Sequence, residues 1–210
     1  MEILKKRWII IGALAGILGA LLGVFLPLSR ALGVRMENRQ LVLKLESRVE
    51  GMTPAQLERE RSLGKWYNWN LARQGSGSWK ESYDTILNLE QGALGVLELP
   101  GRQLPICHGS KPMPGRAGHD PASMLPLGNA GGHTVLFLAE DPALAAGMEV
   151  RVRCLDETFS FRVVSVQRMK GQWNTELLCP GPDAWVTLAV DQRGVRTLIR
   201  CREIRQQRQD

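Results

Sequence analysis

The stretch Val186-Thr187-Leu188-Ala189-Val190-Asp191 lies near the C-terminus and directly follows Cys179-Pro180-Gly181-Pro182-Asp183-Ala184-Trp185. We predict a β-strand from Trp185 to Val190. The segment from Gly95 to Pro100 alternates apolar and polar residues, as a half-buried strand does. Further strands are predicted at residues 149–154, 159–167 and 196–204. Short strands at this spacing, with few helical patterns between them, indicate a mainly β fold in the form of a closed barrel.

Composition limits the class of protein. The 210 residues suit one domain plus an anchor, and 44% hydrophobic residues are enough for a sizeable core. The net charge is +6 and the pI is about 9.5, but no block of basic residues alternates with aromatic ones. We therefore expect no nucleic-acid partner.

The cysteines and histidines do not form a metal-binding pattern. The four cysteines include no C-x-x-C pair and show no metal-ligand spacing with the three histidines; these residues are Cys107, Cys154, Cys179, Cys201, His108, His119 and His133. We expect neither a metal nor a cofactor. In an oxidising compartment four cysteines allow two disulfides with three pairings, and the sequence does not select one.

The N-terminal region predicts a membrane anchor. No charged residue occurs from Trp8 to Leu28, and 21 helical residues span about 30 Å, the thickness of a bilayer core. The segment from Phe25 to Arg30 lacks a small-x-small cleavage site, which favours an uncleaved transmembrane helix over a signal peptide. Residues 1–7 would then form a short N-terminus. The basic residues that flank the span are balanced and do not decide its orientation.

Glycines recur every three or four residues within the predicted span. Gly12, Gly16, Gly19 and Gly23 form two G-x-x-x-G pairs. This spacing lets helices approach closely in lipid and predicts a homodimer. The alternative is that the glycines only reflect the composition of membrane helices.

A helical region is predicted between the span and the barrel. Thr53-Pro54-Ala55-Gln56 is a capping box with proline at the first helical position, and the Gly/Ser-rich residues from Gln74 to Ser78 end the helix. Residues 41–49 form either a separate helix or part of the membrane stalk. We assign residues 29–82 to a helical stalk and linker, 83–204 to the barrel and 205–210 to a charged tail.

Six landmarks in the same order resemble the class C (pilin-type) sortases, membrane-bound cysteine transpeptidases of Gram-positive surfaces. Residues 186–191 match the family's V-T-L-V-T-C strand, except that Asp191 stands at its last position. The other five landmarks are similar to the family's G-x-I-x-I-P, L-P-I-Y-H-G, G-x-G-H, S-L-P-x-G and R-L-L-V-R-G-x-R patterns; they are Gly95–Pro100, Leu104–Gly109, Ala117–His119, Leu125–Gly128 and Arg196–Arg202. The resemblance covers roughly residues 40–204 and implies a sortase-like barrel outside the cell.

The resemblance also implies where a catalytic site would lie. In the family a cysteine attacks the Thr–Gly peptide of a sorting signal, a histidine protonates the leaving amine and an arginine supports the oxyanion. The nucleophile position carries Asp191, the histidine position carries Ala139, and Arg196 is the candidate arginine. The neighbouring Arg193 is the alternative to Arg196. A carboxylate attacks amides weakly and a methyl group moves no proton, so the resemblance predicts an inactive site.

A second alignment to the family predicts an active enzyme. If a gap near residues 128–132 is allowed, His133 takes the place of the catalytic histidine and a displaced cysteine would be the nucleophile. Cys179 and Cys201 are both poorly placed for that role, because one precedes Asp191 by a whole strand and the other points to the opposite face. We therefore expect His133 to be structural or solvent-facing.

The combined expectation is a membrane-anchored, extracellular sortase-like domain without catalysis. It would have a single N-terminal span and would assist surface assembly by binding a sorting-signal peptide, a pilin or an active sortase. One alternative is an active transpeptidase with a displaced Cys/His site. The other is a purely structural extracytoplasmic domain.

Overall fold

The chain divides into two compact units, Met1–Glu37 and Asn38–Asp210. The computed structural model describes residues 23, 25, 28, 29, 32–74, 83–127, 132–170 and 183–204. Residues 1–7, nearly all of the predicted span with Gly12, Gly16 and Gly19, and the tail 205–210 lie outside them. Among the described residues, no helix is both long enough and apolar enough to cross a bilayer.

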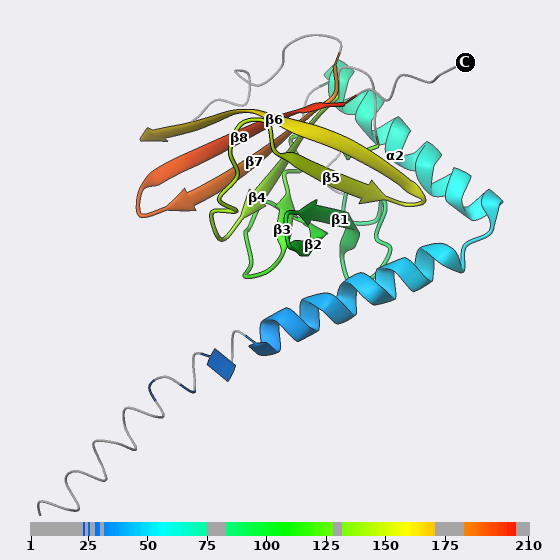
Figure 1. Ribbon diagram of the computed structural model, residues 1–210. Helices are drawn as coiled ribbons and strands as arrows, with labels where there is room; N and C mark the ends of the chain where they lie inside the picture. Colours follow the sequence, from blue (N-terminus) through cyan, green and yellow to red (C-terminus); the bar gives the residue numbers. More distant parts are fainter. Residues whose placement is uncertain are drawn as a thin grey trace, which may run out of the picture. The chain divides into compact units, whose positions relative to one another are not determined.

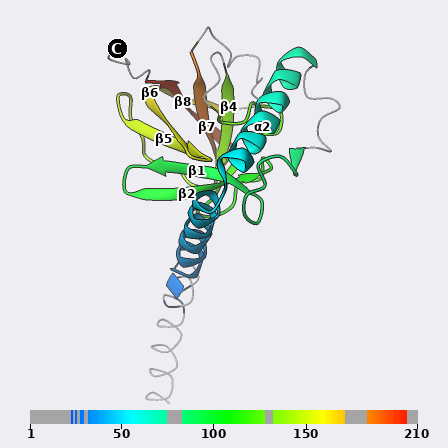
Figure 2. The ribbon, with the colours of Figure 1, turned by 90° about the vertical axis from the view of Figure 1, so that its right-hand side faces the viewer.

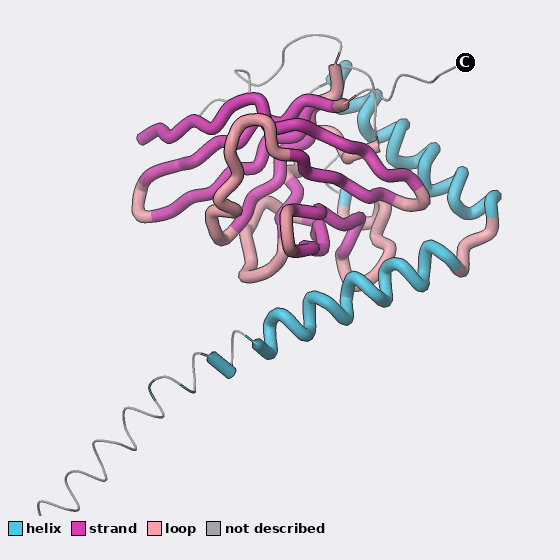
Figure 3. The backbone as a smooth tube through the Cα atoms, viewed as in Figure 1, coloured by secondary structure: helices cyan, strands magenta, loops and turns pink. Residues whose placement is uncertain are grey.

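The second unit contains a closed β-barrel, as the sequence predicts (Figures 1 and 3). Around the barrel the described strands follow the order β1-β2-β3-β4-β7-β8-β6-β5. Their bounds are β1 Ala93–Leu99, β2 Arg102–His108, β3 Ala117–His119, β4 His133–Leu138, β5 Glu149–Cys154, β6 Glu157–Lys170, β7 Trp185–Gln192 and β8 Val195–Glu203. The predicted strand bounds agree with the observed ones within a few residues. Strand β6 is longer than the predicted strand at residues 159–167.

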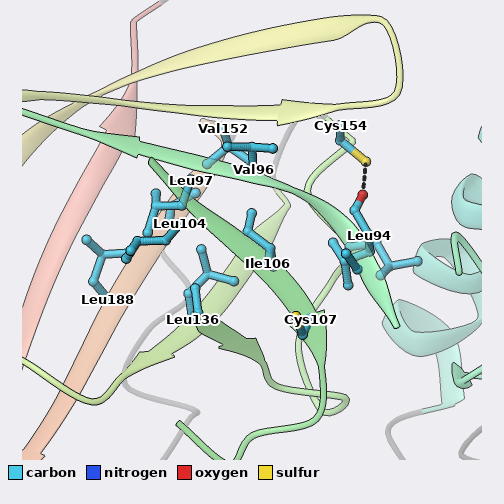
Figure 4. Close-up of a cluster of buried hydrophobic side chains, with 14 of the residues drawn as sticks. Leu94, Val96, Leu97, Leu104, Ile106, Cys107, Leu136, Val152, Cys154 and Leu188 are labelled. Carbon is cyan, nitrogen blue, oxygen red and sulfur yellow. Dashed lines mark hydrogen bonds between the residues drawn. The ribbon is translucent and has the colours of Figure 1, made fainter. Parts of the chain in front are cut away.

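Alternation along the strands separates the core from the outer face. On β7, Val186, Leu188 and Val190 belong to the buried apolar cluster, so the residues between them point away from the barrel interior. Figure 4 shows Leu188 beside Leu136 of the neighbouring strand β4, among side chains from β1, β2 and β5. Asp191 therefore belongs to the outer face.

Two helices precede the barrel. Residues 32–50 are helical, and α2 spans Pro54–Gln74. The predicted capping box is confirmed: the Thr53 hydroxyl accepts a hydrogen bond from the backbone N–H of Gln56 at 3.3 Å, and the Gln56 side chain accepts one from the N–H of Thr53 at 2.8 Å. Because a turn at residues 51–53 separates the helices, residues 41–49 form a helix of their own.

The helical region from Asn38 onward packs with the barrel. The apolar face of the first helix is buried in the core through Leu41, Val42, Leu45 and Val49. On α2, the Asn68 side chain donates to the carbonyl of Leu125 at 3.0 Å and accepts from its N–H at 2.7 Å. The compact unit thus begins well before residue 83, and residues 38–74 are not a stalk that stands apart from the barrel.

Gly118 on β3 lies where only a hydrogen fits. A Cβ at this position would meet the carbonyl oxygens of Gly109 and Lys111 at 2.5 and 3.0 Å. Because both are backbone atoms, Gly118→Ala is expected to lower the free energy of unfolding by about 1–3 kcal/mol. Gly51→Ala is the matched control, since its Cβ would meet backbone oxygens only at 3.4 Å and beyond. Equal stability of the two variants in urea unfolding would contradict this packing.

Candidate functional site

The positions that the resemblance assigns to the nucleophile and the histidine lie at one end of two neighbouring strands. Strands β4 and β7 lie side by side (Figure 2). They are parallel, and Leu138 is opposite Val190. Ala139 follows Leu138 directly after the end of β4, and Asp191 follows Val190 in the last turn-side pairs of β7, so both positions lie at the same end of the two strands. Neighbouring strands are about 4.8 Å apart. An imidazole at residue 139 would therefore lie close to a side chain at residue 191.

The β7–β8 hairpin places Arg196 opposite Asp191. Arg193 and Gly194 have φ angles of 51° and 77°, and Gln192 pairs with Val195. Positive φ at both central residues is typical of a two-residue type I′ turn. The next antiparallel pair is Asp191 and Arg196. Arg193 thus occupies the turn, whereas Arg196 lies on the strand beside the nucleophile position.

Asp191 and Arg196 form a forked ion pair. The Nε and Nη2 atoms of Arg196 donate to the two carboxylate oxygens of Asp191. The side chains are 21% exposed for Arg196 and 49% for Asp191. Exposed pairs of this kind typically contribute only about 0.2–1 kcal/mol. The pair's main consequence is chemical: the guanidinium binds the protein's own carboxylate where the resemblance would place an oxyanion.

His133 lies at the opposite end of β4. It pairs with Trp185, and six residues of strand, about 20 Å, separate it from Ala139. The side chain is 8% exposed, and its Nε2 lies 2.9 Å from the hydroxyl of Thr187. Burial, and then the nearby charge of Arg200, lower the pKa of His133 to about 4. This histidine is structural rather than solvent-facing, and it lies far from Asp191.

The described cysteines are poor nucleophiles. Cys107, Cys154 and Cys201 are free and buried, which excludes two disulfides. Burial raises the pKa of Cys107 and raises that of Cys154 and Cys201 to about 12. Cys154 donates a weak hydrogen bond to the carbonyl of Leu94 (Figure 4). Cys179 lies outside the described residues.

The other two histidines hold loops in place. His119 is fully buried, with Nδ1 2.7 Å from the hydroxyl of Tyr83 and Nε2 2.9 Å from the carbonyl of Met124. The ring nitrogens of His108 lie 3.0 and 2.8 Å from the carbonyls of Gly92 and Ile86. In the part of the chain that the structure describes, no three His, Cys, Asp or Glu residues are grouped to hold a metal ion.

The residues that surround His133 were not predicted from the sequence. Trp185, Thr187 and Arg200 lie around it on the outer face. Strand alternation carried the signal, because Asp191, Thr187 and Trp185 are separated by even numbers of residues.

The barrel and its strand order define a sortase-like fold. Solved structures confirm it. Streptococcus agalactiae sortase C1 is 20% identical with a TM-score of 0.69, and the match covers 80% of this chain and 99% of that one. Sortase C of Clostridium perfringens is 18% identical with a TM-score of 0.69, covering 79% and 98%. Sortase C of Streptococcus pneumoniae is 19% identical with a TM-score of 0.68, covering 80% and 97%.

These structural neighbours are class C sortases, and their fold is the fold of this chain. No protein-family model matches the sequence, and no curated protein sequence matches it either.

Proposed function

We propose that this chain is a sortase-family protein that has lost transpeptidase activity and assists the assembly of pilins or other surface proteins. Its role would be to bind a sorting-signal peptide, a pilin or an active sortase. The single observation that carries the proposal is the Asp191–Arg196 ion pair at the end of β7, next to Ala139. A site with these side chains offers neither a thiolate nor an imidazole.

The sortase fold supports binding in place of catalysis. Of the structural neighbours, the Streptococcus pneumoniae enzyme is described in connection with pilin substrate specificity. Strands β4 and β7, which carry the family's nucleophile and histidine positions, keep their parallel pairing over six residue pairs in this chain. The pair of strands that carries these two positions can therefore outlast the loss of the reacting groups.

We further propose that the domain lies outside the cell and is held by one N-terminal span over Trp8–Leu28. The uncharged length of that segment supports an anchor, and the resemblance supports the orientation. Pairing of two copies through Gly12, Gly16, Gly19 and Gly23 belongs to the same proposal. Crosslinking in membranes through a cysteine introduced at Ala13 or Ala15 would test the pairing.

Peptide binding and thiol labelling together test the proposed function. The full chain in detergent micelles is titrated with a fluorescent sorting-signal peptide that contains the Thr–Gly pair, and anisotropy is measured. We expect saturable binding without cleavage, and weaker binding of a control peptide in which Thr and Gly are exchanged. A thiol-directed analogue of the same peptide should leave the mass of the protein unchanged.

Two results would contradict the proposal in different ways. Covalent modification of any native cysteine by the analogue would show an active, displaced site. Absence of binding to sorting-signal peptides, to pilins and to an active sortase would instead favour a purely structural domain.

A further inference from the structure

The C-terminal half of strand β6 has a second edge to which no described strand is bonded. The strand spans Glu157–Lys170, but β5 pairs only with residues 157–162 of it. Strand β8 pairs with the rest from the other side, after an irregularity between residues 163 and 165. Figure 1 shows β6 extending beyond β5 alongside β8. In the part of the chain that the structure describes, residues 164–170 thus have a strand on one side only, and we call them the β6 edge.

Hydrogen-bond directions along β8 show which backbone groups of the β6 edge point outward. The N–H of Glu203 donates at 3.0 Å to the residue that precedes β7. Because directions alternate along an antiparallel strand, the odd-numbered residues of β8 face β7 and not β6. Val163, Val166 and Arg168 are opposite odd-numbered residues of β8, and the Val163 carbonyl indeed accepts from Gly147 on the other side, at 2.8 Å. The N–H and C=O groups of Val166 and Arg168 therefore point away from β8.

The side chains of the β6 edge are exposed, and they are apolar or basic. Val164 and Val166 are 47% and 39% exposed, and Arg168 and Lys170 are exposed too. Arg168 lies 3.8 Å from a carboxylate oxygen of Asp141, an exposed pair of the kind that contributes little. Outward N–H and C=O groups beside exposed valines are what an added strand binds.

Charge decides which strand the β6 edge can accept. A second copy of the same edge would bring Arg168 and Lys170 of both chains together, and like charges across neighbouring strands are destabilising. Basic side chains on an edge strand oppose such self-pairing. An acidic segment would instead be attracted by both charges. Its apolar residues would cover Val166, which lies on the same face of β6 as Arg168 and Lys170.

We infer that the β6 edge binds an extended acidic segment of a partner protein, which adds to the sheet as a strand antiparallel to β6. Carboxylates of the partner lie opposite Arg168 and Lys170, and apolar side chains lie opposite the valines. Antiparallel pairing is the more stable kind per residue. The inference goes beyond the proposed function, because it requires neither a sorting signal nor the site at Asp191, and β8 lies between this edge and β7.

A designed peptide tests the inference on the full chain in detergent micelles. The capped, fluorescent nine-residue peptide alternates threonine with Glu, Glu, Val and Val in that order, and a twin carries Lys in place of each Glu. Two more versions of the Glu peptide are N-methylated. One is methylated at the second Glu and the first Val, whose N–H groups would face β6, and the other at the two threonines that precede them, whose N–H groups would face away. Anisotropy gives the affinity of each peptide.

We expect the Glu peptide to bind at least about 10-fold more tightly than its Lys twin, because attraction replaces repulsion at two positions. Methylation of the groups that face β6 removes two hydrogen bonds and should weaken binding by about 10-fold or more, whereas the other methylated peptide should bind nearly as well as the parent. Binding should also slow the hydrogen exchange of the Val166 and Arg168 amides.

Variants of the chain test the charges. Arg168→Glu with Lys170→Glu should reverse the preference between the Glu and Lys peptides. Arg59→Glu with Lys65→Glu is the matched control: it changes the net charge equally at exposed positions of α2 and should leave the preference unchanged.

Three results would overturn the inference. They are absence of saturable binding of the Glu peptide, equal affinities of the two N-methylated peptides, and a preference that persists in the Arg168→Glu, Lys170→Glu variant. Self-association of the free chain that protects the Val166 and Arg168 amides would also overturn it, since a second copy would then occupy the edge. None of these results depends on whether sorting-signal peptides bind, so the proposed function is tested separately.

Discussion

A variant that carries both Ala139→His and Asp191→Cys is expected to react with a thiol-directed sorting-signal analogue, whereas the natural chain does not. Leu138 and Val190 are paired across β4 and β7, so the new imidazole and the new thiol would stand side by side at the same end of the two strands. An adjacent imidazole promotes the thiolate, which is the reacting form of cysteine. Replacing Asp191 also removes the carboxylate that binds the guanidinium of Arg196.

The expected effect is large because the three groups act as a unit. Removing members of such a unit typically costs about 10³- to 10⁶-fold in rate, and a positioned acid–base group alone contributes about 10²- to 10⁴-fold. We therefore expect the double variant to be labelled at least about 100-fold faster than Asp191→Cys alone. Intact-mass measurements over time give both rates.

A matched control separates the thiol from the imidazole. Ala139→His with Asp191→Ser keeps the imidazole and a small polar side chain but has no thiol, and it should remain unlabelled. If the double variant reacts no faster than Asp191→Cys alone, residue 139 does not face residue 191, and the assignment of the family's histidine position to Ala139 is wrong.

Local patterns account for the parts of the fold that could be predicted from the sequence. The capping box at Thr53–Gln56 depends on contacts three residues apart, and strand alternation on β7 assigns Leu188 to the core. Both signals lie within one segment. The closed barrel followed from the spacing of such segments, and solved structures with the same fold confirm it.

Features of the site that depend on pairing or packing between distant segments could not be predicted from the sequence. The approach of Ala139 to Asp191 depends on the parallel register of β4 and β7, which lie about 50 residues apart in the chain. The choice between Arg193 and Arg196 depends on a two-residue turn with positive φ at Arg193, an uncommon conformation for a residue other than glycine. The burial of His133 depends on what packs over the outer face, which alternation alone does not reveal.

Acidification from pH 6.5 to pH 4 is expected to lower the free energy of unfolding by about 3 kcal/mol for each of His119 and His133. Burial lowers the pKa of both imidazoles to about 4 in the folded chain, whereas an imidazole in the unfolded chain keeps a value near 6.5. Between these values the unfolded state binds more protons. The stabilisation is therefore complete above pH 6.5 and is lost as the pH falls through 4.

Urea unfolding of the full chain at several pH values measures this loss, and His133→Gln separates it from the titration of carboxylates. Glutamine keeps a side-chain donor for Thr187 but does not titrate, so the variant should lose about half of the histidine contribution between pH 6.5 and 4. Carboxylates contribute equally to both proteins. Identical pH profiles for the two would mean that His133 is accessible to protons in the folded chain, which would contradict its burial beside Thr187.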